Sequence, residues 1–192
     1  MPERIDLGPC IAIRHEVSPQ RYAVILPGMV YPTRAPVLWF AREAAMALGY
    51  SALEVLGEPV EHADMLGWER DCAERAIAEV GPAGVVVIGK SLASLLAAEI
   101  SDLNLPAAWL TPPLTEPSMV DALKRVRTPT LLVGGTADAM WKAEAVPDSA
   151  ALEVVELAGV DHALQRAGDP IASLTALGQM TEALSGWLQR IG

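Results

Sequence analysis

Residues 84–98 read GVVVIGKSLASLLAA, and the order of apolar and small residues in this stretch decides the fold. The four β-branched residues at positions 85–88 are typical of a central strand in a parallel sheet, which is covered on both faces. Leucines and small residues from Leu92 onward favour a helix. A strand therefore runs almost directly into a helix, and Ser91 lies in the corner between them.

Two motifs fit this corner, and they imply different functions. Gly84, Gly89, Lys90 and Ser91 match the phosphate-binding pattern G-x-x-x-x-G-K-[ST]. Gly89, Ser91 and Ala93 match a small-x-Ser-x-small variant of the nucleophile elbow G-x-S-x-G. A phosphate loop must curl its backbone round the phosphates, whereas the four intervening residues here are strand formers whose backbone groups the sheet needs. We therefore favour the elbow, with Ser91 as an ordinary helix N-cap as the alternative.

The composition predicts one domain over residues 1–192. A chain of 192 residues that is 52% hydrophobic has room for one sizeable core. A net charge of −10 argues against nucleic acid or an anionic membrane as partner, because both need a basic face. Two cysteines, Cys10 and Cys72, suggest neither a disulfide framework nor a metal cluster, so we expect no metal and no cofactor. No signal-peptide core or bilayer-length apolar run is present in the sequence, which predicts a cytoplasmic protein.

Strands and helices alternate along the chain from Tyr22 onward. Strands are predicted at residues 22–26, 52–56, 85–88, 106–110, 129–133 and 151–157, and helices at residues 36–48, 65–80, 92–100, 119–126 and 171–188. A further strand at residues 10–14 is expected to form an antiparallel hairpin with residues 22–26 at a sheet edge. The alternation predicts the α/β class: a three-layer α/β/α sandwich round an open, mostly parallel sheet.

A serine hydroxyl becomes a good nucleophile only when a histidine takes its proton and a carboxylate orients that histidine. Of the three histidines, only His162 follows a predicted strand at the carboxyl edge of the sheet, where Ser91 lies. Asp138 follows the predicted strand at residues 129–133 at the same edge, and Glu116 is the alternative acid. The chain order Ser91, Asp138, His162 is the order expected for an elbow of this kind. The sequence therefore predicts a Ser-His-Asp triad.

Three short segments together resemble the α/β-hydrolase superfamily: GKSLA at residues 89–93, GGTAD at residues 134–138 and VDH at residues 160–162. Within it the chain looks most like the small, lidless, dienelactone-hydrolase-like branch of serine hydrolases, over residues 22–192. It departs from that pattern where Pro27-Gly28 replaces His-Gly and where the N-terminal antiparallel strands are reduced to a single one. An edge left open in this way is expected to allow a homodimer.

The resemblance implies a role for each site residue. Ser91 would be the nucleophile, His162 the general base and then acid, and Asp138 the group that orients His162. The oxyanion hole would consist of the backbone N–H groups of Met29 and Leu92.

The expected site is open and shallow, because residues 111–128 leave no room for a lid domain. Tyr31, Lys90, Trp109 and Trp141 lie in or beside carboxyl-side loops and are candidates to line an apolar pocket. The alternatives are that the tryptophans pack in the core, and that Lys90 points to solvent rather than attracting an anionic acid group.

We expect a serine hydrolase that cleaves a small-molecule ester or thioester through an acyl-enzyme. A peptidase or an acyltransferase would use the same residues. The rival interpretations are a non-catalytic binding protein with this fold and, less favoured, a P-loop nucleotide binder.

Overall fold

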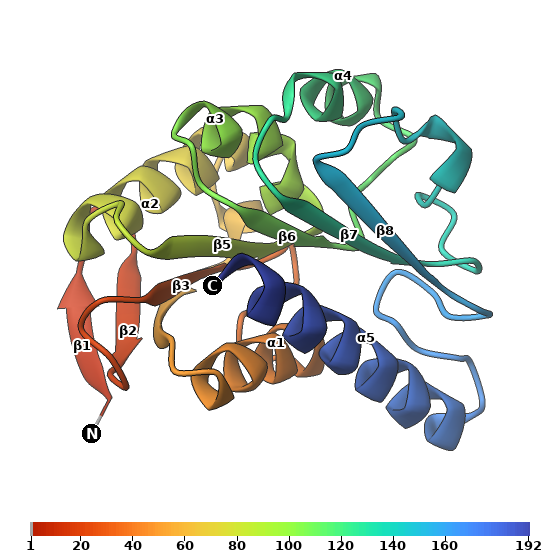
Figure 1. Cartoon of the computed structure of the whole chain (residues 1–192), viewed down its shortest axis with the longest axis horizontal. Helices are drawn as coiled ribbons and strands as arrows, with labels where there is room; N and C mark the ends of the chain where they lie inside the picture. Colours follow the sequence, from red (N-terminus) through yellow and green to blue (C-terminus); the bar gives the residue numbers. More distant parts are fainter. Residues whose placement is uncertain (1) are drawn as a thin grey trace.

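The computed structural model describes residues 2–192, whose strands form one sheet (Figure 1). The eight strands are β1 (Glu3–Asp6), β2 (Ile11–His15), β3 (Tyr22–Leu26), β4 (Ser51–Leu56), β5 (Val85–Lys90), β6 (Ala107–Leu110), β7 (Thr130–Gly135) and β8 (Leu152–Leu157). From edge to edge their order is β1-β2-β4-β3-β5-β6-β7-β8. All neighbours from β4 to β8 run parallel, while β1–β2 and β2–β4 are antiparallel pairs.

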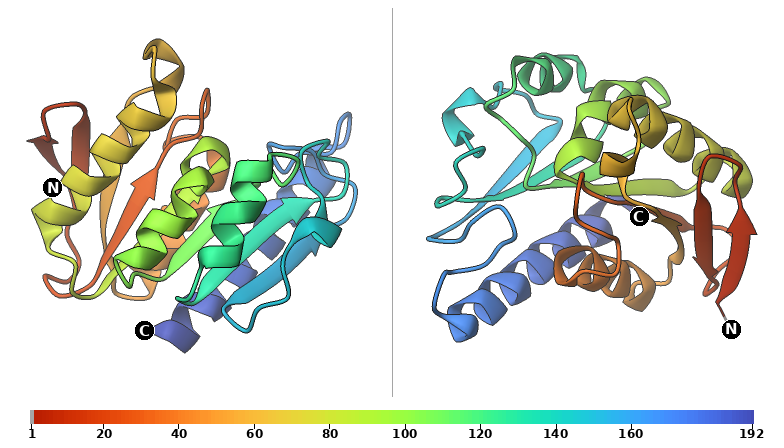
Figure 2. Two further views of the ribbon diagram at one scale, coloured as in Figure 1. Left: turned by 90° about the horizontal axis from the view of Figure 1, so that it is seen from above. Right: turned by 180° about the vertical axis from the view of Figure 1, so that it is seen from behind.

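Helices cover both faces of the sheet, which gives the predicted three-layer sandwich (Figures 1 and 2). The helices are α1 (Pro36–Ala47), α2 (Met65–Val80), α3 (Ala97–Asp102), α4 (Pro117–Arg125) and α5 (Pro170–Ile191), with short 3₁₀ helices η1 (Pro59–Glu61), η2 (Ser91–Leu96) and η3 (Ala143–Ala145). Successive side chains of a strand point to opposite faces. Val85 and Val87 therefore enter the core beneath α2, α3 and α4, whereas Val86 and Ile88 enter the core beneath α1 and α5.

The predicted hairpin between residues 10–14 and 22–26 is wrong. β2 instead pairs antiparallel with β1 and β4, so two N-terminal antiparallel strands are present where one was expected. β3 lies between β4 and β5, and all five of its residues are buried, as is typical of a central strand whose two faces are covered by helices. The connection crosses the end of β4, where Ser51 Oγ accepts hydrogen bonds from the N–H groups of Val17 and Ser18, both 2.9 Å long.

The corner after β5 differs in detail from the predicted helix over residues 92–100. Residues 85–88 pair with β3 and β6, so their backbone is committed to the sheet and does not form a phosphate loop. The chain then forms η2 before α3 begins at Ala97. Ser94 Oγ donates a hydrogen bond to the carbonyl of Ser91 at 2.5 Å, which stabilises this tighter turn.

The segment between β6 and β7 leaves the carboxyl edge of the sheet uncovered by a lid. Residues 111–129, all of them described, form loops and the nine-residue helix α4. α4 lies at the periphery of the fold (Figure 1). The expectation of a lidless architecture is therefore met.

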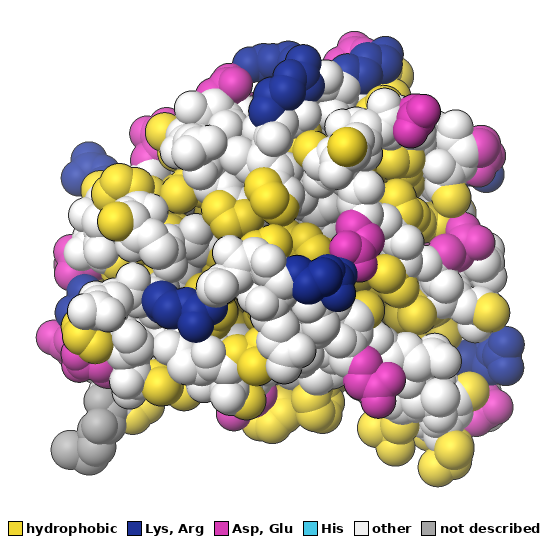
Figure 3. All heavy atoms as spheres, viewed as in Figure 1, with side chains coloured by type: hydrophobic (Ala, Val, Ile, Leu, Met, Phe, Trp, Pro, Cys, Tyr) yellow, Lys and Arg dark blue, Asp and Glu magenta, His cyan; other side chains and the backbone are white. Residues whose placement is uncertain are grey.

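The last helix, α5, is three residues longer at its C-terminus than predicted. Asp169 caps its start by accepting a hydrogen bond from the N–H of Ala172 at 2.9 Å. Its buried stripe includes Met180, Leu184 and Leu188, at four-residue spacing. Hydrophobic atoms are visible over its N-terminal end (Figure 3). Among the described residues, no helix combines the length and apolar character needed to cross a bilayer.

Candidate active site

Ser91 lies at the tight turn between β5 and η2, with a backbone φ of +52°. A positive φ is strained for a residue with a side chain, and such strain is typical of functional turns. The turn is tight enough to exclude larger neighbours. A Cβ added at Gly89 would lie 2.8 Å from Ala93 Cβ and 2.8 Å from Trp109 Cζ3. The small residues of the small-x-Ser-x-small pattern are therefore required by close packing.

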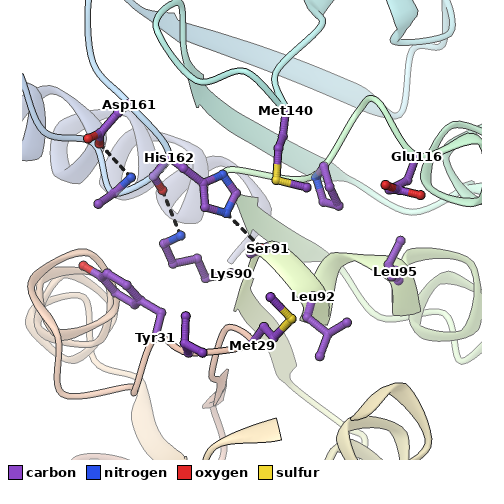
Figure 4. A pocket seen from close by; sticks show the side chains of 13 residues that line it. Met29, Tyr31, Lys90, Ser91, Leu92, Leu95, Glu116, Met140, Asp161 and His162 are labelled. Carbon is purple, nitrogen blue, oxygen red and sulfur yellow. Dashed lines mark hydrogen bonds between the residues drawn. The ribbon is translucent and has the colours of Figure 1, made fainter. Parts of the chain in front are cut away.

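Ser91, His162 and Asp138 form a continuous hydrogen-bonded chain. His162 Nε2 lies 2.9 Å from Ser91 Oγ (Figure 4). His162 Nδ1 lies 2.7 Å from Asp138 Oδ2. The three residues follow the carboxyl ends of β5, β7 and β8. The structure thus brings together the three residues singled out in the sequence. Glu116, the alternative acid, lies on the far side of Ser91 from His162 (Figure 4).

The environment of Asp138 keeps its carboxyl group ionised. Burial on its own would raise the pKa of Asp138. Hydrogen bonds from His162 and from the N–H of Met140, which is 2.9 Å from Oδ1, together with the positive charge of Lys90, lower that pKa below its usual value. An ionised carboxylate can only accept, so His162 Nδ1 carries the proton and Nε2 is free to accept from Ser91 Oγ–H.

The two expected oxyanion-hole residues both lie beside Ser91 (Figure 4). Gly28 and Tyr31 close a tight loop through two mutual N–H to carbonyl hydrogen bonds, 2.8 and 3.2 Å long, and Met29 lies within it. Leu92 lies in the first turn of η2, where N–H groups have no partner within the helix. The loop after β3 and the start of η2 thus approach the same side of the serine.

Comparison with known proteins identifies the architecture. No family model matches the chain, and no curated protein matches its sequence. Solved structures do match. They include a lidless α/β serine hydrolase from Xanthomonas campestris (TM-score 0.71, 16% identity, covering 99% of this chain and 94% of that one). Est1E from Butyrivibrio proteoclasticus has a TM-score of 0.74 at 16% identity, with 98% of both chains covered. A dienelactone hydrolase from Anabaena variabilis has a TM-score of 0.72 at 17% identity, with 98% of both chains covered.

The protein has the α/β-hydrolase fold. The assignment rests on the shared architecture over nearly the full length of these chains. It agrees with the resemblance that the segments at residues 89–93, 134–138 and 160–162 suggest.

A cavity of about 500 Å³ opens beside Ser91 in this α/β-hydrolase fold. Much of its wall is apolar and comes from loops at the carboxyl edge, with Met29, Leu92, Leu95 and Met140 among its members (Figure 4). Tyr31 and Lys90, both predicted, also line it. Sequence reasoning missed Leu95, Met140 and Asp161 as wall residues. Met140 lies two residues after Asp138, and Asp161 directly precedes His162, so the closeness of both to triad residues was a usable signal.

The prediction that Trp109 and Trp141 line this pocket is wrong. Both side chains lie in the core of the α/β-hydrolase fold, with 0% and 5% exposure. Trp109 projects from β6 beneath Gly89, under the nucleophile rather than beside it. The alternative of core packing therefore applies to both tryptophans.

Trp141 supports the loop that carries Asp138. Its ring lies directly on Gly134 of β7, where an added Cβ would come within 1.9 Å of Cε3. Its Nε1 donates to Glu156 Oε2 at 2.7 Å, and its backbone N–H donates to the carbonyl of Asp138 at 3.1 Å. Trp141 thus fixes the acid loop against β7 and β8.

Lys90 does not point to solvent, in contrast to the alternative considered for it. Its side chain is buried, and Nζ donates to Thr111 Oγ1 and to the carbonyl of His162, each at 2.9 Å. Burial lowers the pKa of Lys90 to about 8, while the charges of Asp138 and Asp161 oppose that shift. Sequence reasoning missed Thr111, whose only signal is its place at the carboxyl end of a strand.

Proposed function

We propose that the protein is a serine hydrolase that cleaves small carboxylic esters or thioesters through an acyl-enzyme. The proposal is supported by one observation above all: Ser91 at a strained turn, 2.9 Å from His162 Nε2, with His162 Nδ1 2.7 Å from a carboxylate that is kept ionised. The alternative role of Ser91 as a helix N-cap would explain the serine, but it would not explain the histidine and the buried acid aligned with it.

In the acylation step, Ser91 Oγ attacks the carbonyl carbon of the ester while His162 Nε2 takes its proton. Asp138 stabilises the imidazolium through Nδ1–H. The oxyanion that forms is held by the backbone N–H groups of Met29 and Leu92. When the tetrahedral intermediate collapses, His162 gives its proton to the leaving alcohol or thiol, and the acyl group stays on Ser91.

Deacylation repeats these steps with water as the nucleophile. His162 Nε2 takes a proton from the water that attacks the acyl-enzyme, and then returns a proton to Ser91 Oγ as the acid leaves. His162 is suited to this step because its side chain is 34% exposed, so water can reach the imidazole.

The shape of the cavity supports a small substrate. Its volume of about 500 Å³ is within the range of small-molecule sites, and the wall near Leu92 and Leu95 is apolar. The absence of a lid in residues 111–129 leaves the mouth open to solvent. Fold neighbours named as a serine hydrolase without lid and as a dienelactone hydrolase favour the same reaction class.

Labelling with a fluorophosphonate probe tests the proposal. Wild type and Ser185→Ala, a control on α5, are expected to react covalently, whereas Ser91→Ala is not, with all three equally folded by circular dichroism. A folded wild type that is not labelled would overturn the proposal and favour a non-catalytic binding protein.

The choice of substrate can be tested with p-nitrophenyl esters and the corresponding thioesters. Acetate and butyrate esters are expected to turn over faster than palmitate, because the extended acyl chain of palmitate is too long for a compact cavity of about 500 Å³ and would project from its mouth into water. A preference for the long chain would contradict the small-substrate proposal while leaving the nucleophile in place.

A further inference from the structure

We propose that Lys90 is a positioning residue whose ammonium group fastens the main chain of His162 to the end of β6 and thereby holds the imidazole over Ser91. This inference deepens the proposed function and rests on it. Although Lys90 lines the cavity, its ammonium group would act through His162 and not by binding the substrate or the reacting atoms.

The contacts of Lys90 Nζ join two segments that are distant in the sequence. One hydrogen bond reaches Thr111 Oγ1, directly after β6. The other reaches the carbonyl of His162 in the loop after β8 (Figure 4). Thr111 is a rigid anchor, since it is fully buried and its N–H donates to the carbonyl of Val133 at 2.6 Å. Lys90 therefore connects the base-bearing loop to the centre of the sheet.

The ammonium group has little capacity left for a substrate anion. An ammonium has three N–H donors. Two point to oxygens at 2.9 Å, and the ring of Tyr31 covers Nζ at 4.6 Å from its centroid. Tyr31 is itself held in place, because its hydroxyl accepts a hydrogen bond from the N–H of Val37 at 3.1 Å. These three neighbours favour a role in holding His162 over a role in binding an acid group.

A lysine at this position is not explained by stability. Its side chain is 1% exposed, and burial of an ammonium group costs free energy that a hydrophobic residue of the same length would avoid. The lysine also affects the third residue of the site, because its positive charge is one of the influences that lower the pKa of Asp138. Lys90 thus acts on the base through contact and on the acid through charge.

The charge of Lys90 depends on groups from each element that surrounds it. Tyr31 faces it from the loop after β3, Asp138 from the loop after β7, and Asp161 and His162 from the loop after β8. Thr111, directly after β6, is uncharged. Because burial lowers the pKa of Lys90 to about 8, the ammonium loses its charge at mildly alkaline pH. We therefore expect the wild-type labelling rate to decline as the pH rises through about 8, and the hold on His162 to weaken with it.

Lys90→Met tests the inference, because methionine keeps the unbranched stem and removes both the charge and the donors. The rate of fluorophosphonate labelling and kcat for a neutral ester are expected to fall about 100-fold, the loss typical of a misplaced catalytic group, with KM little changed. The alkaline decline should disappear. Lys124→Met, on the exposed face of α4, is the matched control and should behave as wild type.

Hydrogen exchange of the segment at residues 158–166 separates this inference from the proposed function, because it does not require activity. Faster exchange there in Lys90→Met, with β5 unchanged, supports the positioning role even if the folded wild type proves inactive. Wild-type exchange and a wild-type labelling rate would overturn it. Loss of activity toward carboxylate-bearing esters alone would also overturn it, in favour of a substrate contact.

Thr111→Val provides a second variant if Lys90→Met does not fold. Valine removes one acceptor of the ammonium and keeps the shape of the side chain. We expect the labelling rate to fall by about 10-fold, less than in Lys90→Met, and hydrogen exchange of residues 158–166 to become faster. The absence of both changes would contradict the inference.

Discussion

Gly134→Ala should inactivate the site from a position outside the triad, through the ring of Trp141. The new Cβ would lie 1.9, 2.2 and 2.4 Å from Cε3, Cδ2 and Cζ3 of Trp141, where carbon atoms normally stay about 3.5–4.0 Å apart. The indole must therefore move by roughly 1.5–2 Å. Because the N–H of Trp141 donates to the carbonyl of Asp138, the acid loop would move with it.

The size of the effect follows from overpacking and from misplacement. Forcing one methyl group into a close-packed core typically costs about 1–3 kcal/mol of unfolding free energy. A displacement of about 1 Å at a catalytic group costs on the order of 100-fold in rate. We therefore expect kcat for p-nitrophenyl acetate to fall by roughly two orders of magnitude. This loss should exceed the decrease in the fraction of folded molecules, because most molecules stay folded after a loss of about 1–3 kcal/mol.

Paired measurements of kcat and of thermal unfolding would test this prediction. Gly178→Ala is the control, since nothing lies within 4 Å of its added Cβ, and alanine in an exposed helix should stabilise by about 1 kcal/mol. Trp141→Phe in the Gly134→Ala background should recover part of the activity, because the smaller ring relieves the overlap. Gly134→Ala with wild-type kcat and melting temperature would refute the reasoning.

Two further substitutions test the electrostatics. Glu69 on α2 is fully buried, its carboxylate oxygens have no hydrogen-bond partner among the described residues, and burial, with a smaller effect of Cys10, raises its pKa from 4.5 to about 8. The folded state therefore binds more protons between these pH values, and stability falls as the pH rises from about 4.5 to about 8. Glu69→Gln should remove that decline and stabilise the protein at pH 8 by a few kcal/mol, at about 1.4 kcal/mol per pKa unit; an unchanged pH dependence of the melting temperature would count against it. Asp138→Asn should lower kcat by about 10,000-fold, because an amide can hold His162 in the wrong tautomer and cannot stabilise the imidazolium; a loss of less than tenfold would contradict the assigned role.

The parts of the fold that local sequence determines could be predicted. Four β-branched residues before Gly89 predict β5, because such a run fits a strand buried on both faces. The positions of Asp138 and His162 followed from the rule that parallel strands end at one edge. The pairing of residues 11–15 could not be predicted, because a tight hairpin to β3 and a longer connection to β4 look alike in sequence.

The direction of a side chain at a strand end was harder to predict than its position. Lys90 is charged and follows a glycine, so sequence favours exposure, yet β5 extends to this residue and directs it between Thr111 and the His162 loop. Trp141 lies in a loop and still packs in the core, since Gly134 leaves space for its ring. The place of Lys90 depends on contacts with Thr111 and His162, 21 and 72 residues away, and the place of Trp141 depends on how its loop folds back over β7. Hydrophobic periodicity reports neither.

The place of β8 in the sheet has a consequence for how the protein loses activity. Within residues 2–192, β8 pairs with β7 alone, whereas β5 has strands on both sides. Edge elements open at lower free-energy cost than central ones. Fraying of β8 would carry His162 away from a serine whose own strand stays intact, and such molecules would keep nearly all of their circular dichroism. Mild heat or denaturant should therefore inactivate the protein reversibly, at conditions well short of its global unfolding transition.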